Sequence, residues 1–162
     1  MPVTLEQLLQ SRDNRVKHQK DLLGAHPGRS LLCLTVQLPG PEKRNRFSLA
    51  IAREGVEAIR EAFRPEYEEL RDLETGFEGY FMVPLLPADA KRIACRIEDT
   101  HPLGRLMDID VVADGPISRE ELGLEPRKCL LCDQPARYCM RARTHTVSEL
   151  QERIGQLLEG YL

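Results

Sequence analysis

Asp108 and Asp110 stand in an otherwise apolar run of the sequence from Leu106 to Val112. The run predicts a β-strand, on which alternate side chains share a face, so the two acids lie about 6.6 Å apart at roughly 3.3 Å per residue. Two carboxylates at that separation repel by about 2 to 3 kcal/mol at an effective dielectric of about 20. A divalent cation removes this conflict, and Mg²⁺ typically binds one or two carboxylates together with substrate phosphates. The pair therefore indicates metal-assisted phosphate chemistry with one or two Mg²⁺ ions.

The same pair also fits the end of a strand. Asp114-Gly115 is a hairpin signal, so the strand could end close to the acids. Solvent, backbone amides or Arg105 would then satisfy both carboxylates. A D-x-D match alone does not separate the two interpretations, because short acidic motifs are common.

A second group of chemically active residues lies in PRKCLLCDQPARYCMRARTH, residues 126–145. Cys129, Cys132, Cys139 and His145 follow a C-x2-C-x6-C-x5-H spacing, and four soft ligands so close together could form a tetrahedral zinc site. The six-residue gap is shorter than that of common zinc fingers, however, and a helical Cys139 could simply face the core. A structural zinc site and a set of core cysteines are both open at this point.

The same segment is rich in basic residues: Arg127, Lys128, Arg137, Arg141 and Arg143. Guanidinium groups bind phosphate oxygens bidentately, so the cluster suits an anionic substrate held near the two acids. A solvated basic surface is the alternative. No P-loop or Rossmann glycine motif accompanies the cluster.

Size and composition favour one globular domain over residues 1–162, with segment 126–145 inside it. The chain has 162 residues, of which 41% are hydrophobic and 30% charged, which is ordinary for a domain with its own core. An odd number of cysteines without an export signal favours reduced thiols and a cytoplasmic location. The apolar runs are too short for a membrane span, and the net charge of −3 gives no nucleic-acid signature, so we expect neither partner.

Hydrophobic spacing predicts how the elements alternate. Helices are expected over 5–23, 47–63, 88–98 and 135–143 and from residue 147 onward, and strands over 31–38, 67–73, 77–83 and 106–112. Thr4 with Gln7 and Thr146 with Glu149 form capping boxes for the first and last helices. The elements do not follow a regular βαβ order, which favours an α+β fold with a single mixed or antiparallel sheet flanked by helices.

The first predicted helix is cationic through Arg12, Arg15, Lys17 and Lys20. Such a helix presents either a solvated charged face or a docking surface for an acidic partner. Charge alone does not decide between these two.

Three strings occur together, in the order HPLGRLMDIDV (101–111), ISREELG (117–123) and PRKCLLCDQPARYCMRARTH (126–145). They resemble the apo-citrate lyase phosphoribosyl-dephospho-CoA transferase family, also called holo-citrate lyase synthase. SRDNR at 11–15 and the PGP turn at 39–41 are similar too, so the resemblance spans most of the chain. Several long strings together are far more specific than D-x-D alone.

The resemblance implies transfer of a 5′-phosphoribosyl-dephospho-CoA group from 2′-(5″-triphosphoribosyl)-3′-dephospho-CoA to a serine of the citrate lyase acyl carrier protein. Pyrophosphate would be released. The family's D-x-D strand is similar to that of polymerase-β-like nucleotidyltransferases, so a core of that type is expected. Those enzymes usually carry a Gly-Ser turn about ten residues before the acids, whereas Gly104-Arg105 stands immediately before them here.

Residues and resemblance together predict one site, in which Asp108 and Asp110 bind Mg²⁺ and Arg105 contacts the triphosphate. The other predicted substrate contacts are Gly104, His101, Arg127, Arg141 and Arg143. A third carboxylate could come from Glu98, Asp99, Asp114 or Glu120, and the sequence does not choose. Two other classes of function remain open: a Mg²⁺-dependent phosphohydrolase, and a zinc-stabilised binding module without catalysis.

Overall fold

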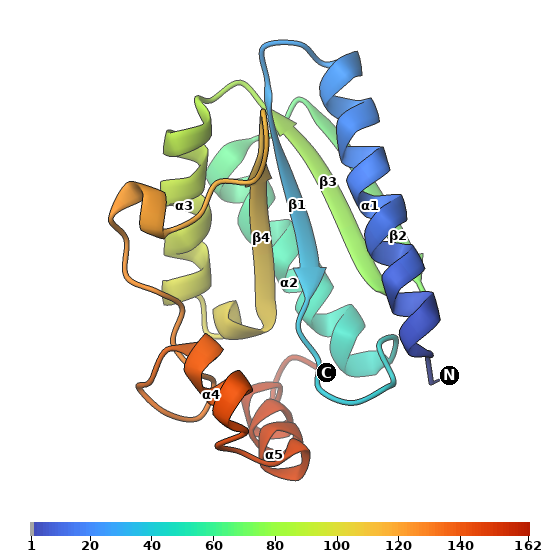
Figure 1. Cartoon of the computed structure of the whole chain (residues 1–162), viewed down its shortest axis with the longest axis vertical. Helices are drawn as coiled ribbons and strands as arrows, with labels where there is room; N and C mark the ends of the chain where they lie inside the picture. The colour runs from blue at the N-terminus through green and yellow to red at the C-terminus, as the bar shows by residue number, and fades with distance from the viewer. Residues whose placement is uncertain (1) are drawn as a thin grey trace.

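A single antiparallel sheet forms the centre of the molecule (Figure 1). The computed structural model describes residues 2–162. The strands are β1 (Ser30–Val36), β2 (Tyr67–Leu73), β3 (Gly76–Val83) and β4 (Met107–Val112), and their order across the sheet is β2-β3-β1-β4. The predicted strand 106–112 is thus one residue shorter, because Leu106 ends a 3-10 turn that begins at Gly104. β4, which carries the two aspartates, is an edge strand.

The strand register decides which side chains share a face. Cys33 of β1 lies opposite Asp110 of β4 and opposite Tyr80 of β3. Thr35 lies opposite Asp108 and Glu78 in the same way. Because side chains alternate along a strand, this face carries the acids together with a small apolar cluster that includes Leu31, Met82 and Val112, whereas the opposite face is apolar. The face with the acids is called the polar face below.

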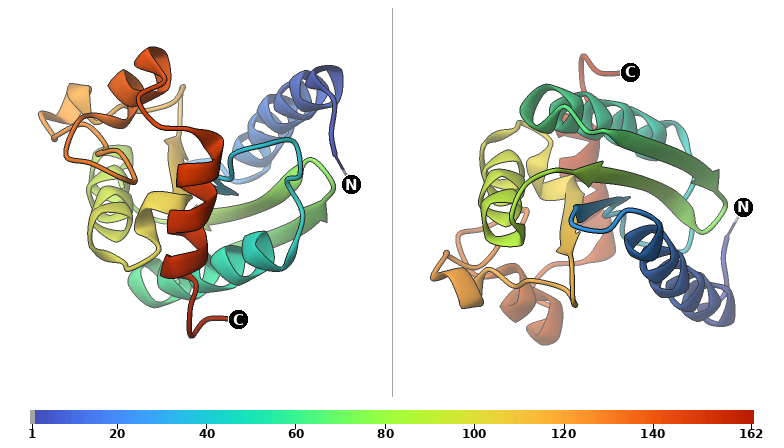
Figure 2. Two further views of the ribbon diagram at one scale, coloured as in Figure 1. Left: turned by 90° about the horizontal axis from the view of Figure 1, so that it is seen from below. Right: turned by 90° about the horizontal axis from the view of Figure 1, so that it is seen from above.

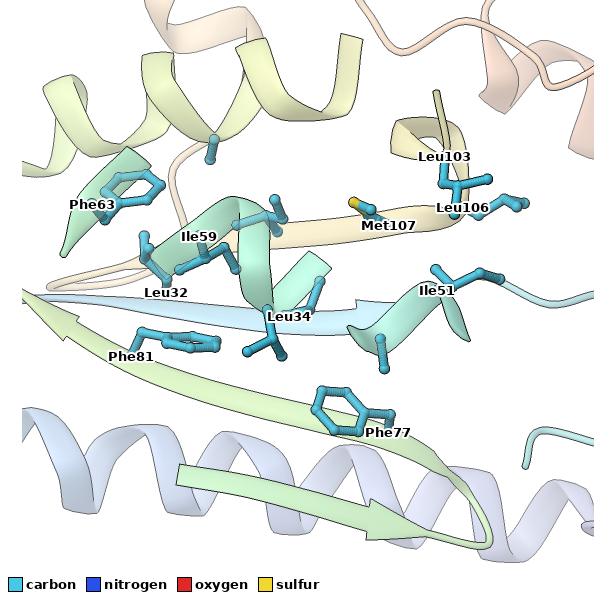
Figure 3. Close-up of a cluster of buried hydrophobic side chains, with 14 of the residues drawn as sticks. Leu32, Leu34, Ile51, Ile59, Phe63, Phe77, Phe81, Leu103, Leu106 and Met107 are labelled. Carbon is cyan, nitrogen blue, oxygen red and sulfur yellow. The ribbon is translucent and has the colours of Figure 1, made fainter. Parts of the chain in front are cut away.

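The apolar face is covered by α2 (Arg46–Phe63) and α3 (Pro87–Thr100), which enclose the main core (Figure 3). Leu32 and Leu34 of β1 are buried there with Phe81 of β3 and Met107 of β4. α2 contributes a stripe with the helical spacing predicted from the sequence, through Ala52, Val56, Ile59 and Phe63. A well-packed layer on one side therefore fixes the backbone of β4.

The polar face is covered only in part, by α1 (Leu5–Ala25), which lies on the side of the sheet opposite α2 (Figure 2). In Figure 1, α1 crosses in front of β2 and β3, whereas β4 is viewed with no helix in front of it. α1 runs two residues beyond its predicted end, and the leucines that the sequence places on one side of it are not all buried. Leu5, Leu9 and Val16 remain 71%, 48% and 49% exposed.

The chain after β4 runs through irregular structure to α4 (Ala136–Ala142) and α5 (Val147–Leu157). Both helices lie beyond the N-terminal end of β4 (Figure 1). α5 joins the main core through Ile154, with Leu158 just after it. The predicted α+β class, with one antiparallel sheet flanked by helices, is confirmed, whereas a polymerase-β-type core stays a prediction. No helix of residues 2–162 has the length and apolar character needed to cross a membrane.

Candidate functional site

The acid pair has the arrangement that the strand periodicity predicts. Asp108 and Asp110 are partly buried, and the residues between and beside them, Met107, Ile109 and Val111, are fully buried on the other face. Gln37, just beyond β1, donates from Nε2 to Oδ2 of Asp108 at 3.0 Å. The two carboxylates therefore project from a rigid strand onto the uncovered part of the polar face.

The electrostatics of the pair are unfavourable in the absence of a cation. Burial and the neighbouring Asp108 carboxylate raise the pKa of Asp110 to about 7, and Lys91 only partly opposes this shift. Among residues 2–162, no Arg or Lys forms a hydrogen bond or salt bridge with Asp110. Arg127 approaches Asp108 only to 4.0 Å. The site thus holds a negative charge that the protein leaves largely uncompensated.

Two other acids on the same face, Glu78 and Glu69, are paired with cationic side chains. Glu78 receives the hydroxyl of Tyr80 at 2.5 Å and the Arg15 guanidinium at 3.4 Å. Burial opposes ionisation of Glu69, but hydrogen bonds from Arg71, His18 and Tyr67 outweigh it and lower the pKa of Glu69.

Arg15 therefore faces the sheet, which corrects its expected place in an outward-facing cationic cluster. Asp108 and Asp110 differ from these acids because neither accepts a hydrogen bond from an Arg or Lys side chain of residues 2–162 and the nearest guanidinium, Arg127, is 4.0 Å from Asp108.

Among the four candidates for a third carboxylate, Glu98 makes the most hydrogen bonds within the protein. It is buried and accepts the Ile109 amide at 2.8 Å, Arg119 at 2.7 Å and Arg127 at 2.8 Å. Its carboxylate thereby covers the free edge of β4 and neutralises two arginines. Asp99 pairs with Arg119 at 3.0 Å. Glu98 is thus a support of the acid strand, and the other two candidates, Asp114 and Glu120, are exposed.

The two arginines nearest the acids join β4 to the segment that follows it. Arg127 donates from Nη1 to the Met107 carbonyl at 2.7 Å and from Nη2 to the Arg105 carbonyl at 3.0 Å. Arg105 in turn donates to the carbonyl of Cys129. Both guanidiniums lie at the end of β4 that carries Asp108. Their hydrogen bonds to backbone carbonyls show that they join the start of β4 to the segment around Cys129.

Gly104 and His101 shape the turn before β4. A Cβ atom on Gly104 would lie 2.3 Å from the carbonyl oxygen of Glu98, so only glycine allows this turn to pack on α3. The His101 Nδ1 atom accepts the Leu103 amide at 2.9 Å, and burial lowers the pKa of His101. Arg141 and Arg143 are exposed, and no contact among the described residues joins them to the acids.

The predicted soft ligands do come together. The ligand atoms of Cys129, Cys132, Cys139 and His145 all lie within 4.8 Å of one another, and no other His, Cys, Asp or Glu group of three or more converges in this way within residues 2–162. The Sγ atoms of Cys132 and Cys139 are 3.5 Å apart, and His145 Nε2 is 3.5 Å from the Cys132 Sγ. The spacing thus correctly predicted which side chains meet.

Two residues of the acid site were missed from the sequence. Gln37 lies inside the predicted strand 31–38, just beyond the end of β1, and carries no recognisable signal. Lys91 lies in the predicted helix 88–98 without having been singled out there, yet it is only 7% exposed, and its charge acts on Asp110. Its spacing from Ala94 and Glu98, by three and seven residues, would have placed it on the buried side of α3.

Fold and site together define an α+β protein with an unneutralised acid pair suited to divalent-cation and phosphate chemistry. The comparisons identify the family to which the chain belongs. The model of the apo-citrate lyase phosphoribosyl-dephospho-CoA transferase family matches residues 3–161.

A protein of that name from Escherichia coli O1:K1 / APEC is 37% identical over 163 residues, covering 96% of this chain and 88% of the relative. A Streptococcus pyogenes serotype M18 protein, whose name carries the qualifier "probable", is 36% identical over 167 residues, covering 98% and 87%. The chain belongs to this family. The predicted family and the predicted class of enzyme, a transferase, are confirmed.

Proposed function

We propose that this chain transfers the 5′-phosphoribosyl-dephospho-CoA group from its triphosphate precursor to a serine of the citrate lyase acyl carrier protein. The observation that carries the proposal is the acid pair of β4, whose negative charge Lys91 and Arg127 offset only in part, in a chain whose family is named for this transfer. Attack of an oxygen nucleophile on a triphosphate donor requires a site that stabilises the negative charge of the phosphate oxygens.

Mg²⁺ fits the donor set. Asp108 and Asp110 offer hard oxygen ligands from one face of a rigid strand, and their mutual repulsion is relieved when a cation lies between them. When bound, Mg²⁺ would neutralise the phosphate oxygens of the donor and the charge developing on pyrophosphate. The chain's own residues hold the carboxylates in place: Gln37 orients Asp108, and Glu98 fixes the Ile109 amide between the two acids.

The cations around the pair have separate roles. Lys91 lies on the Asp110 side, is only 7% exposed and has no salt-bridge partner among residues 2–162, so its charge is available to a donor phosphate bound beside Asp110. Arg127 lies on the Asp108 side and is already bonded to Glu98 and to the β4 backbone. We assign Lys91 to the donor and Arg127 to the positioning of the acid strand.

The reaction forms one bond and breaks one. The carrier serine Oγ attacks the phosphorus nearest the ribose, a P–O bond to pyrophosphate breaks, and the serine proton is lost to solvent or to a base. Pyrophosphate carries away the electron pair of the broken bond. The product is a phosphodiester between the serine and the prosthetic group.

The exposed side of α1 is the proposed carrier-docking surface. Leu5, Leu9, Arg12 and Val16 follow a spacing that places them on one side of the helix, and each is exposed. Gln19 continues that side and hydrogen-bonds to Cys33, whose neighbour across the sheet is Asp110. Acyl carrier domains are generally acidic around their modified serine, which suits Arg12 and the nearby exposed Lys20.

Intact-mass measurement of the carrier tests the proposal. After incubation with donor, Mg²⁺ and this protein, the carrier should gain the mass of one phosphoribosyl-dephospho-CoA group, with one pyrophosphate released per modified carrier. Pyrophosphate release that needs no carrier would instead identify a phosphohydrolase. An unmodified carrier without pyrophosphate would identify a binding module.

A further inference from the structure

The segment from residue 126 to 146 has almost no apolar core of its own. Only two of its residues are buried, Cys129 and Cys139. Leu130 and Leu131 are only partly buried, and Leu130 is the one of the two that packs against the main core. Tyr138 and Met140 are 56% and 76% exposed. A stretch that buries so little apolar surface gains little hydrophobic stabilisation to offset the conformational entropy lost on ordering. Something other than hydrophobic packing must hold it.

The backbone of this segment is folded so that four ligand side chains converge. Lys128 and Pro135 form a β-bridge that closes a short hairpin containing Cys129 and Cys132. α4 then presents Cys139. Arg143 ends α4 in the left-handed conformation, with φ at 50°, and His145 follows two residues later.

The distances match a tetrahedral ion. With zinc–sulfur bonds of about 2.3 Å and zinc–nitrogen bonds of about 2.0 Å, tetrahedral ligands lie about 3.8 Å apart for two sulfurs and about 3.5 Å for sulfur and nitrogen. Cys132 Sγ lies 3.5 Å from Cys139 Sγ and 3.5 Å from His145 Nε2. The Leu131 amide also donates to Cys129 Sγ at 3.5 Å, a contact of the kind that supports a metal-bound thiolate.

We propose that Cys129, Cys132, Cys139 and His145 bind one structural Zn²⁺ ion through three sulfurs and Nε2. Four protein ligands close the coordination sphere, as is typical of structural rather than catalytic zinc. The ion replaces the missing core of the segment.

This zinc site is joined to the acid strand. Arg105 donates to the carbonyl of the ligand Cys129, and Arg127, two residues before that ligand, donates to the carbonyls of Arg105 and Met107. Zinc therefore fixes the segment that carries Arg127 against the end of β4 near Asp108. This consequence for the active site rests on the proposed function, whereas metal binding does not.

Metal analysis of the freshly purified full chain tests the site directly. We expect one zinc per chain in the wild type and a near-complete loss in Cys132→Ser and His145→Gln. Cys95→Ala is the matched control, because Cys95 is buried in α3 outside the cluster, and it should keep its zinc. A wild type without zinc, or zinc retained in both ligand variants, would overturn the proposal.

Cobalt substitution of the wild type avoids the risk that a variant fails to fold. Co²⁺ in a tetrahedral site with three thiolates should give intense visible bands and a thiolate charge-transfer band in the near ultraviolet. Weak bands typical of octahedral Co²⁺ would contradict the assignment.

In a transfer assay, the zinc-free protein should show a larger rise in KM for the donor than loss in kcat. This readout depends on the proposed reaction, while the metal content and the spectrum do not.

Discussion

The acid pair on β4 and the Cys/His cluster after it are two metal-competent regions built in opposite ways. Asp108 and Asp110 project from a strand whose other face is fully buried, so the fold holds both carboxylates in place even without a metal ion. The proposed ligands Cys129, Cys132, Cys139 and His145 lie in a segment in which no other residue is fully buried. In the first region the fold prepares a place for an ion, and in the second an ion would complete the fold.

The comparison predicts different responses to losing a ligand. In the strand, removing a carboxylate should abolish chemistry while sparing stability. In the cluster, removing a thiolate should mainly lower the stability of the fold, and should lower transfer activity only as a consequence. Glu98, Arg105 and Arg127 connect the two regions, so damage to those links should affect both.

The largest effect is expected from the acids themselves. Asp108→Asn and Asp110→Asn should each lower carrier modification by several orders of magnitude, because each removes a ligand charge at the reacting phosphates. Circular dichroism should show an unchanged fold. Asp72→Asn, an exposed acid on β2, is the control and should retain wild-type transfer. Near-wild-type turnover in both site variants would refute the assignment.

The link between the regions comes next. Glu98→Gln removes the charge that pairs with Arg119 and Arg127 inside the protein, and breaking a buried pair in this way costs about 3 kcal/mol. Urea unfolding should report the loss. Arg60→Gln breaks exposed pairs with Glu57 and Glu68 and should cost at most about 1 kcal/mol. Equal effects of the two changes would show that Glu98 is not a special support.

The acid pair should also make stability depend on pH. The pKa of Asp110 is about 7 in the folded chain and about 3.9 when unfolded, so the folded state binds more protons between those values. Without added Mg²⁺, stability should therefore fall as pH rises from 5 to 8, by on the order of 2 kcal/mol. Asp110→Asn should remove this component, measured as the difference between the two unfolding curves. Parallel curves would contradict the raised pKa.

The smallest effect concerns the carrier. Arg12→Glu with Lys20→Glu should raise KM for the carrier several-fold and leave KM for the donor unchanged, because exposed charges mainly steer association. The effect should shrink with salt, since the Debye length is about 8 Å at physiological ionic strength. Arg92→Glu with Arg96→Glu on α3 changes the net charge equally and should alter neither constant. A change in donor KM would instead place α1 at the triphosphate.

The sequence by itself determined the local features of this protein. Alternation in residues 106–112 placed both acids on one face, capping boxes located the starts of α1 and α5, and the C-x2-C-x6-C-x5-H spacing selected the four side chains that converge. Each of these depends on neighbours within a few turns or one strand, where backbone geometry alone dictates the outcome. The family motifs likewise identified the class of enzyme.

Only the tertiary structure decided which charges meet. The charge pattern of the first helix placed Arg15 in an outward cationic cluster, but the packing of α1 on the sheet turned Arg15 to Glu78. The packing of α3 likewise buried Lys91 near Asp110. Glu98 became a support rather than a third ligand because α3 lies along the free edge of β4. These outcomes depend on strand order and helix placement, and contacts between residues distant in sequence leave no local periodicity from which to predict them.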